Sequence, residues 1–85
     1  MTTYRILCNS EHEQTMLLAM LRVAIGDNCC AANGYVLGPS VDFTIDEPTD
    51  RLRAVLAAYD SLVGAWSGWL WQTGTNNSPL NWRDL

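Results

Sequence analysis

The chain has 85 residues and a net charge of −4. This length allows one domain, and a hydrophobic content of 48% is typical of a globular chain rather than of a disordered one. All five basic residues are arginines, which are too few to build the basic patch that a nucleic-acid backbone requires. We therefore expect no direct nucleic-acid binding.

The sequence also predicts a compartment. No stretch reaches the roughly 18 apolar residues of a transmembrane helix, and the residues from Met1 to Arg5 do not resemble the start of a signal peptide. The three cysteines are an odd number and show no disulfide framework. These features predict a cytoplasmic protein that does not associate with a membrane.

The first predicted elements are a strand and a helix. Thr3–Cys8 alternates like a strand, with Tyr4 and every second residue after it on one face. Ser10 and Glu13 form a capping box, which predicts a helix from there to about Ile25. This helix has an apolar stripe for the core and a second stripe beside it, formed by Met16, Met20 and Val23.

The middle of the chain reads as a pair of strands. Asn33-Gly34 predicts a tight turn, followed by a short strand at 35–37 and a second turn at 38–40. Val41–Asp46 alternates clearly, so one face of this strand is expected in the core and the other in water.

A second helix is predicted after Pro48, with Thr49 as its N-cap and Asp50 in its first turn. Apolar residues then recur at helical spacing as far as Trp66. Trp69–Thr73 alternates like a last strand, so either Trp69 and Trp71 or Leu70 must face the core.

The order strand, helix, strand, strand, helix, strand predicts one α+β domain over residues 1–74. The simplest arrangement is a ferredoxin-like βαββαβ sandwich, with two helices on one face of an antiparallel sheet. Residues 75–85 are rich in turn formers, and their apolar side chains predict that this segment docks on the domain. Those side chains are Leu80, Trp82 and Leu85.

The search for catalytic or metal-binding groups gives one candidate. Cys8 precedes the N-terminus of a helix, where a thiolate is stabilised, but it also shares the predicted core face. Cys8 and His12 alone do not provide the three or four ligands of a zinc site. We therefore predict no metal, no cofactor and no catalytic residue, with an enzyme using Cys8 as the remaining alternative.

Two surfaces are candidates for binding. The first is an acidic patch, which would dock a protein with a basic surface or simply be solvated; it comprises Asp42, Asp46, Glu47 and Asp50. The second is a self-association surface that would form a homodimer. It comprises the second stripe of the first helix and the small residues Ala54, Ala58 and Ser61 of the second helix.

The sequence thus favours a non-enzymatic binding module that occupies the surface of a protein partner. In size and charge the chain is similar to small phage-encoded inhibitors such as anti-CRISPR proteins, and this similarity transfers no residue roles. The alternative is an oligomer that sequesters a small molecule or nucleotide in pockets between subunits lined by tryptophans.

Overall fold

The structure is a computed structural model that describes residues 1–35, 38–64, 66–74 and 79–85, with Tyr35 described by its backbone alone. Its helices and strands are β1 (Thr2–Leu7), α1 (Glu11–Ile25), β2 (Cys30–Tyr35), β3 (Gly38–Ile45), α2 (Asp50–Val63), β4 (Trp69–Gln72) and β5 (Leu80–Asn81). Short 3₁₀ turns lie at Asp27–Cys29 and Trp82–Asp84.

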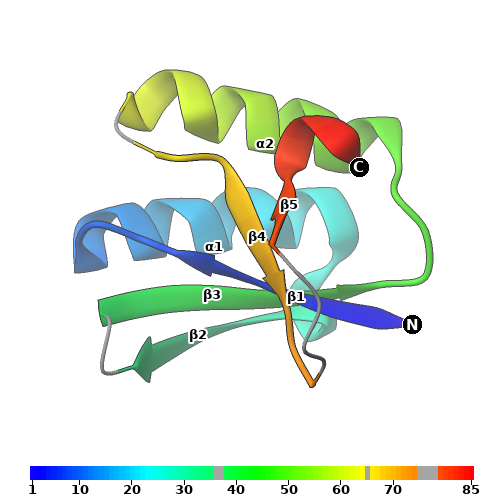
Figure 1. Cartoon of the computed structure of the whole chain (residues 1–85), viewed down its shortest axis with the longest axis horizontal. Coiled ribbons are helices and arrows are strands. Elements are labelled where there is room, and N and C mark those ends of the chain that lie inside the picture. Colours follow the sequence, from blue (N-terminus) through cyan, green and yellow to red (C-terminus); the bar gives the residue numbers. More distant parts are fainter. Residues whose placement is uncertain (36–37, 65, 75–78) are drawn as a thin grey trace.

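The strands form one antiparallel sheet in the order β2-β3-β1-β4-β5, and both helices lie on the same side of it (Figure 1). β3 lies between β1 and β2, and β1 lies between β3 and β4, so the two β-α-β units are interleaved. The predicted α+β fold with two helices on one sheet face is confirmed. β5 adds a strand beyond the βαββαβ pattern.

Local capping explains where both helices begin. The Ser10 hydroxyl accepts a hydrogen bond from the main-chain N–H of Glu13 at 3.2 Å, and the Glu13 carboxylate accepts one from the N–H of Asn9. The Thr49 hydroxyl accepts from the N–H of Leu52 at the start of α2. The predicted helix starts are therefore confirmed, since each cap satisfies N–H groups that the helix leaves free.

The predicted turn at Asn33-Gly34 is wrong. Both residues lie inside β2, where Asn33 pairs with Ser40 and Gly34 with Pro39. The strand β3 also begins at Gly38 rather than after a second turn. A turn preference acts only locally, and here the pairing along the whole length of β2 and β3 overrides it. Residues 36–37 of the predicted short strand lie outside the described residues.

The core lies between the sheet and the helices. Its fully buried side chains come from β1, β3 and β4 on one side and from α1 and α2 on the other; they include Ile6, Leu17, Leu21, Val41, Phe43, Leu52, Leu56, Tyr59 and Leu70. None of the helices that the structure describes is long and apolar enough to span a bilayer.

The end of the described chain packs on α2. The N–H of Trp82 donates to the carbonyl of Gly68 at 2.8 Å, and the Trp82 ring stacks on Trp66 with 6.3 Å between centroids. Trp66 in turn meets Tyr59 edge to face at 5.1 Å. A row of three aromatic rings therefore joins the C-terminal segment to the core.

Candidate binding surface

The side of the sheet opposite the helices is not covered by either helix. Ile6 pairs with Val41 in the register of β1 and β3, and both are buried toward the helices. Because successive side chains of a strand alternate between the two faces, Arg5 and Asp42 lie on the opposite, uncovered face. Thr3 and Thr44 share this face, and their hydroxyls are 2.7 Å apart.

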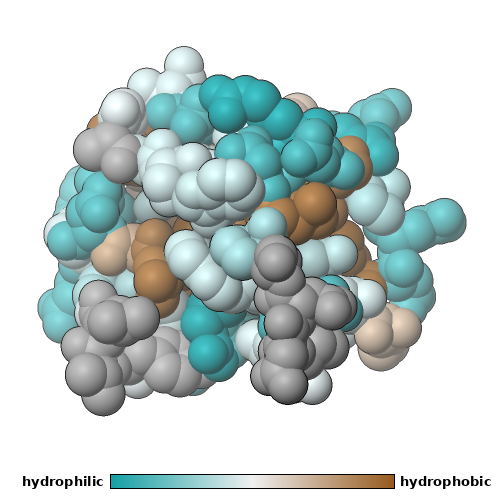
Figure 2. Space-filling view, viewed as in Figure 1, coloured by the Kyte–Doolittle hydropathy of each residue, from teal (hydrophilic) through white to brown (hydrophobic). Residues whose placement is uncertain are grey.

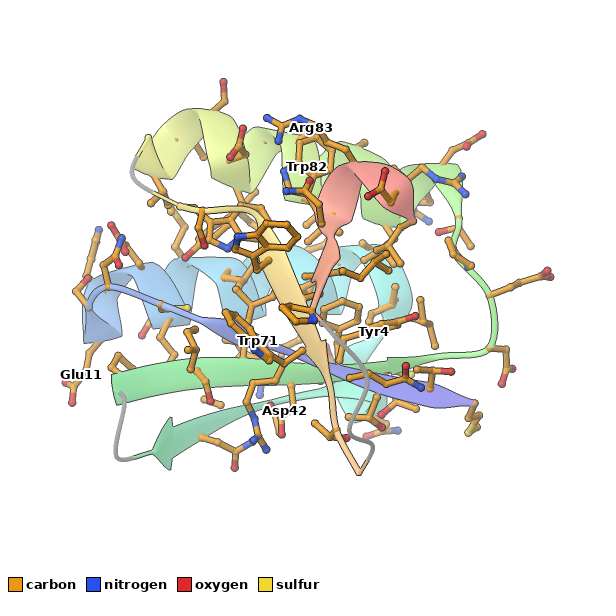
Figure 3. All side chains as sticks on the ribbon, viewed as in Figure 1. Tyr4, Glu11, Asp42, Trp71, Trp82 and Arg83 are labelled. Atoms are coloured by element: carbon orange, nitrogen blue, oxygen red, sulfur yellow. The ribbon has the colours of Figure 1, made fainter. Side chains whose placement is uncertain are left out.

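A polar row crosses the middle of the uncovered face. Arg5 binds Asp42 through two contacts, from Nε to Oδ1 at 3.0 Å and from Nη2 to Oδ2 at 3.2 Å. The Asn33 amide also donates to Asp42 Oδ2 at 3.0 Å. Trp71 pairs with Arg5 from the other side, so the row runs from β4 to β2. Figure 3 labels two of its members, Trp71 and Asp42.

Two tryptophans lie at one end of this row. Trp69 and Trp71 are 41% and 37% exposed, whereas Leu70 between them is fully buried. The alternation predicted from the sequence is confirmed, and it is Leu70 that faces the core. We name the surface formed by Trp69, Trp71, Arg5 and Asp42 the tryptophan face.

The tryptophan face has the chemistry of a recognition surface. Indole rings offer large apolar area at low entropic cost, and a bidentate Arg–Asp pair holds a rigid polar centre beside them. In the view of Figure 2, small brown areas are separated by paler and teal residues, and no broad apolar field is seen. Surfaces that mix apolar and polar residues in this way are typical of transient protein–protein interfaces.

The sequence left open whether Trp69 and Trp71 or Leu70 face the core, and neither of the two binding surfaces predicted from it includes these tryptophans. The alternation of Trp69, Leu70 and Trp71 was the available signal, but it did not say which set faces inward. The pairing of Arg5 with Asp42 joins residues that are 37 positions apart, so no local pattern could reveal it.

The predicted acidic patch is only partly assembled. Asp42 is ion-paired on the tryptophan face, so the expectation that it is a free solvated carboxylate is wrong. Asp46 and Glu47 are exposed just after β3, and the Asp46 carboxylate lies 4.0 Å from the Met1 amino group. Asp50 is exposed in the first turn of α2 and pairs with Arg53 at 3.0 Å.

The pairing of Asp42 makes a prediction about stability. Asp42→Asn leaves the half-buried Arg5 without its counter-charge, so we expect a loss of about 1–2 kcal/mol in the free energy of unfolding. Asp46→Asn removes an exposed charge and is the control, with an expected change within about 0.5 kcal/mol. Urea unfolding of the two variants checks this, and equal stabilities would contradict the assigned role of Asp42.

The residues predicted for self-association differ in their exposure. Met16 and Met20 are half-buried and pack against the core, so they are not an unused stripe. Val23 is 75% exposed on α1. The small residues of α2 are exposed as well; they are Ala54, Ala58 and Ser61.

Cys8 is enclosed by the core. Burial raises the pKa of the Cys8 thiol, and a hydrogen bond with the Tyr59 side chain only partly opposes this shift. Burial likewise raises the pKa of the Tyr59 hydroxyl well above its usual range. A buried thiol with a raised pKa is a poor nucleophile, since the thiolate is the reactive form.

The burial of Cys8 predicts its reactivity. We expect iodoacetamide at pH 8 to alkylate Cys8 at least about a hundred-fold more slowly than the partly exposed Cys29, because Cys8 reacts only after local opening. Mass spectrometry of the intact and digested protein measures both rates. Rapid alkylation of Cys8 in the folded protein would restore it as a candidate nucleophile.

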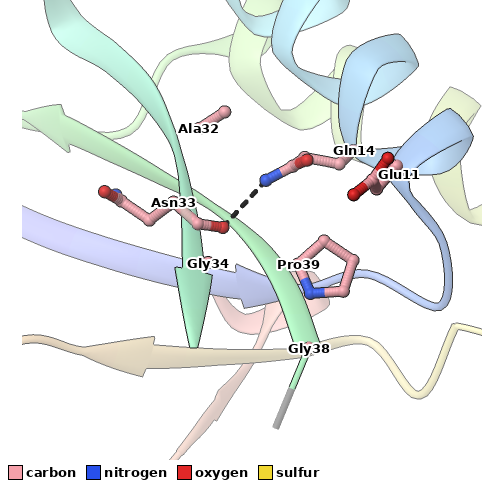
Figure 4. Close-up of a pocket in the computed structure, with 7 residues that line it drawn as sticks. All are labelled: Glu11, Gln14, Ala32, Asn33, Gly34, Gly38 and Pro39. Atoms are coloured by element: carbon pink, nitrogen blue, oxygen red, sulfur yellow. Dashed lines mark hydrogen bonds between the residues drawn. The ribbon is translucent and has the colours of Figure 1, made fainter. Parts of the chain in front are cut away.

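The described residues form open pockets whose linings are partly polar and partly apolar. One of them has a volume of about 530 Å³ and lies between the N-terminal turn of α1 and the end of β2 (Figure 4). Gln14 crosses its base and donates to the carbonyls of Asn33 and Ser40, both at 2.8 Å. Two smaller pockets flank Cys29, and no tryptophan lines any of the three.

Within the described ranges, no three acidic, histidine or cysteine side chains are placed to hold one metal ion. Comparisons with protein-family models, with curated proteins and with solved structures find no significant match to this chain.

Proposed function

We propose that this protein is a non-enzymatic binding module that docks on a protein partner through the tryptophan face. The observation that carries the proposal is the exposure of Trp69 and Trp71 on the sheet face that neither α1 nor α2 covers. Contact between exposed aromatic side chains and water is unfavourable, so covering them with a partner lowers the free energy. Trp and Arg are also among the residues most enriched at the energetic centres of protein interfaces.

The distribution of charge supports a particular kind of partner. Arg5 and Asp42 are the only charged residues in the five strands, so the strands carry no net charge. Eight of the nine acidic residues and four of the five arginines lie elsewhere, and they account for the whole net charge of −4. A partner with an apolar recess for the indoles and a basic rim therefore fits this molecule best.

In this proposal, the acidic residues that follow β3 lie at the rim of the binding surface. Asp46 and Glu47 are exposed beyond β3, which is the strand that carries Asp42. Charges at a rim act mainly by steering association, so these residues would raise the association rate rather than hold the complex together. The proposed partner therefore still has a basic surface, as the sequence predicts, but the centre of the interface is formed by Trp69 and Trp71 rather than by the acidic residues.

Sequestration of a small molecule is the second candidate. The pocket beside Gln14 has a suitable volume, since ligand sites usually measure about 300–1,000 Å³. Its open shape and the lack of aromatic side chains among its described lining residues rank it below the tryptophan face.

Capture with matched variants tests the proposed function. The immobilised protein is exposed to a lysate of its source organism, alongside a Trp69→Thr/Trp71→Thr variant and a Val23→Thr/Leu62→Thr variant. Threonine suits a strand and already occupies this face at Thr3 and Thr44. The control removes two exposed apolar side chains from the helices.

We expect proteins bound by the wild type to be lost with the tryptophan variant and kept with the helix variant. Retention by the tryptophan variant, with loss from the helix variant, would place the binding surface on the helices instead.

A further inference from the structure

The strand β2 forms an open edge of the sheet. It is the terminal strand in the sheet order, and Figure 1 shows it at the rim of the molecule, on the side away from α2. Its sequence, Cys30 to Tyr35, has neither a charged residue nor a proline. Natural proteins usually protect an edge strand with such residues, because the free N–H and C=O groups can pair with another strand.

The hydrogen-bond pattern identifies which main-chain groups of β2 point away from β3. The N–H of Cys8 donates to the carbonyl of Pro39 at 2.9 Å, so Pro39 and every second residue after it on β3 bond toward β1. The residues between them, including Ser40 and Asp42, therefore bond toward β2. Given the register of β2, the groups that point outward are those of Cys30, Ala32 and Gly34.

We infer that this edge binds the β2 edge of a second copy of the chain, with the two strands antiparallel and a two-fold axis at Ala32. In this register Ala32 pairs with Ala32 of the second copy, and Cys30 pairs with Gly34. The outward groups of these residues then form about six hydrogen bonds between the chains, as in any antiparallel ladder.

The side chains along this edge permit the pairing. Ala31 and Ala32 are both exposed and small, and Gly34 has no side chain. Ala31 would stand opposite Asn33 of the second copy, where no like charges meet. The two-fold register therefore places its smallest side chains at its centre.

Charges on α1 match the same symmetry. α1 runs antiparallel to β2, because Gln14 bonds to Asn33 whereas Arg22 lies by Cys30 and opposes the burial-driven rise in the pKa of the Cys30 thiol. Glu11 lies beside the other end of the strand, since it lines a pocket with Gly34. Neither Glu11 nor Arg22 has an ion-pair partner within the described residues.

A two-fold axis at Ala32 brings Glu11 of each copy toward Arg22 of the other. This complementarity favours a second copy over an unrelated extended peptide, because the two-fold axis supplies an opposite charge for both Glu11 and Arg22. The pairing is independent of the proposed function, because it uses the edge of the sheet and leaves its uncovered face free. A dimer of this kind would carry both tryptophan faces on the same side of one continuous sheet.

Light scattering after size exclusion tests the inference, from about 10 μM to 500 μM protein. We expect the wild type to reach twice the 9.5 kDa mass of one chain. Ala32→Pro removes an outward N–H at a position where an edge strand tolerates proline, and it should be monomeric. Circular dichroism checks that this variant is folded.

Charge reversal tests the register without altering the strand. Glu11→Arg places like charges together twice and should weaken the dimer by about ten-fold or more, while Glu11→Arg/Arg22→Glu should restore it. Asp84→Arg makes the same charge change in the C-terminal 3₁₀ turn, which contacts α2 on the side of the molecule away from β2, and it should dimerise like the wild type. A wild type that stays monomeric, or a dimer unaffected by both Ala32→Pro and Glu11→Arg, would overturn the inference.

Discussion

Replacing Trp82 by alanine is expected to lower the free energy of unfolding by about 3 kcal/mol, at the lower end of the range for core aromatic residues because the ring is only partly buried. Trp82 stacks on Trp66, and Trp66 packs on the buried Tyr59. Truncation would remove the outermost ring of this row and detach the C-terminal segment from α2. For a domain of this size the melting temperature should fall by at least about 12 °C.

Two controls separate the role of the ring from other contributions of this segment. Trp82→Phe keeps an aromatic ring and removes an indole N–H that is buried without a hydrogen-bond partner among the described residues, so its cost should stay below about 1.5 kcal/mol. Arg83→Ala removes an exposed cation 4.9 Å from the Trp82 ring and should cost less than about 1 kcal/mol.

Thermal unfolding followed by circular dichroism measures all three variants. A Trp82→Ala protein that melts within a few degrees of the wild type would show that the C-terminal segment contributes little to the core.

The second large effect concerns binding. In the Trp69→Thr/Trp71→Thr protein we expect the affinity for the captured partner to fall by at least about thirty-fold, because one buried tryptophan anchor typically contributes 2 kcal/mol or more. Both rings are partly covered in the free domain, so some loss of stability is also expected. Affinities should therefore be measured well below the melting temperature of the variant.

Rim charges provide the matching control for this binding prediction. Asp46→Asn/Glu47→Gln changes exposed side chains at the end of β3. It should slow association at low salt and leave the dissociation rate nearly unchanged. The tryptophan variant should instead dissociate faster. If both variants changed only the association rate, the tryptophans would not be anchors.

Features that depend on neighbouring residues could be predicted from the sequence. Ser10 and Thr49 cap their helices through hydrogen bonds that span three residues, and the alternation in β3 reports directly which side chains are buried. The order of these elements then restricts the sheet to few arrangements, which is why the fold class was predictable.

Features that depend on pairing between distant segments could not be predicted. Asn33-Gly34 resembles a turn, yet it is held in a strand by the register with β3. The alternation within β3 predicts that Asp42 is a solvated carboxylate, but the pairing of β1 with β3 places Arg5 beside it. Leu70 is fully buried whereas Trp69 and Trp71 are exposed, and the alternation within β4 does not say which of the two sets faces inward.

Hydroxyl-radical footprinting of the complex tests most directly whether the tryptophan face is the binding surface. The protein is oxidised alone and with its captured partner, and the rate of modification is compared at Trp69, Trp71, Val23 and Leu62, all of which are exposed in the free domain. We predict strong protection of both tryptophans and little change at Val23 and Leu62. Unprotected tryptophans together with protected helix residues would contradict the proposal.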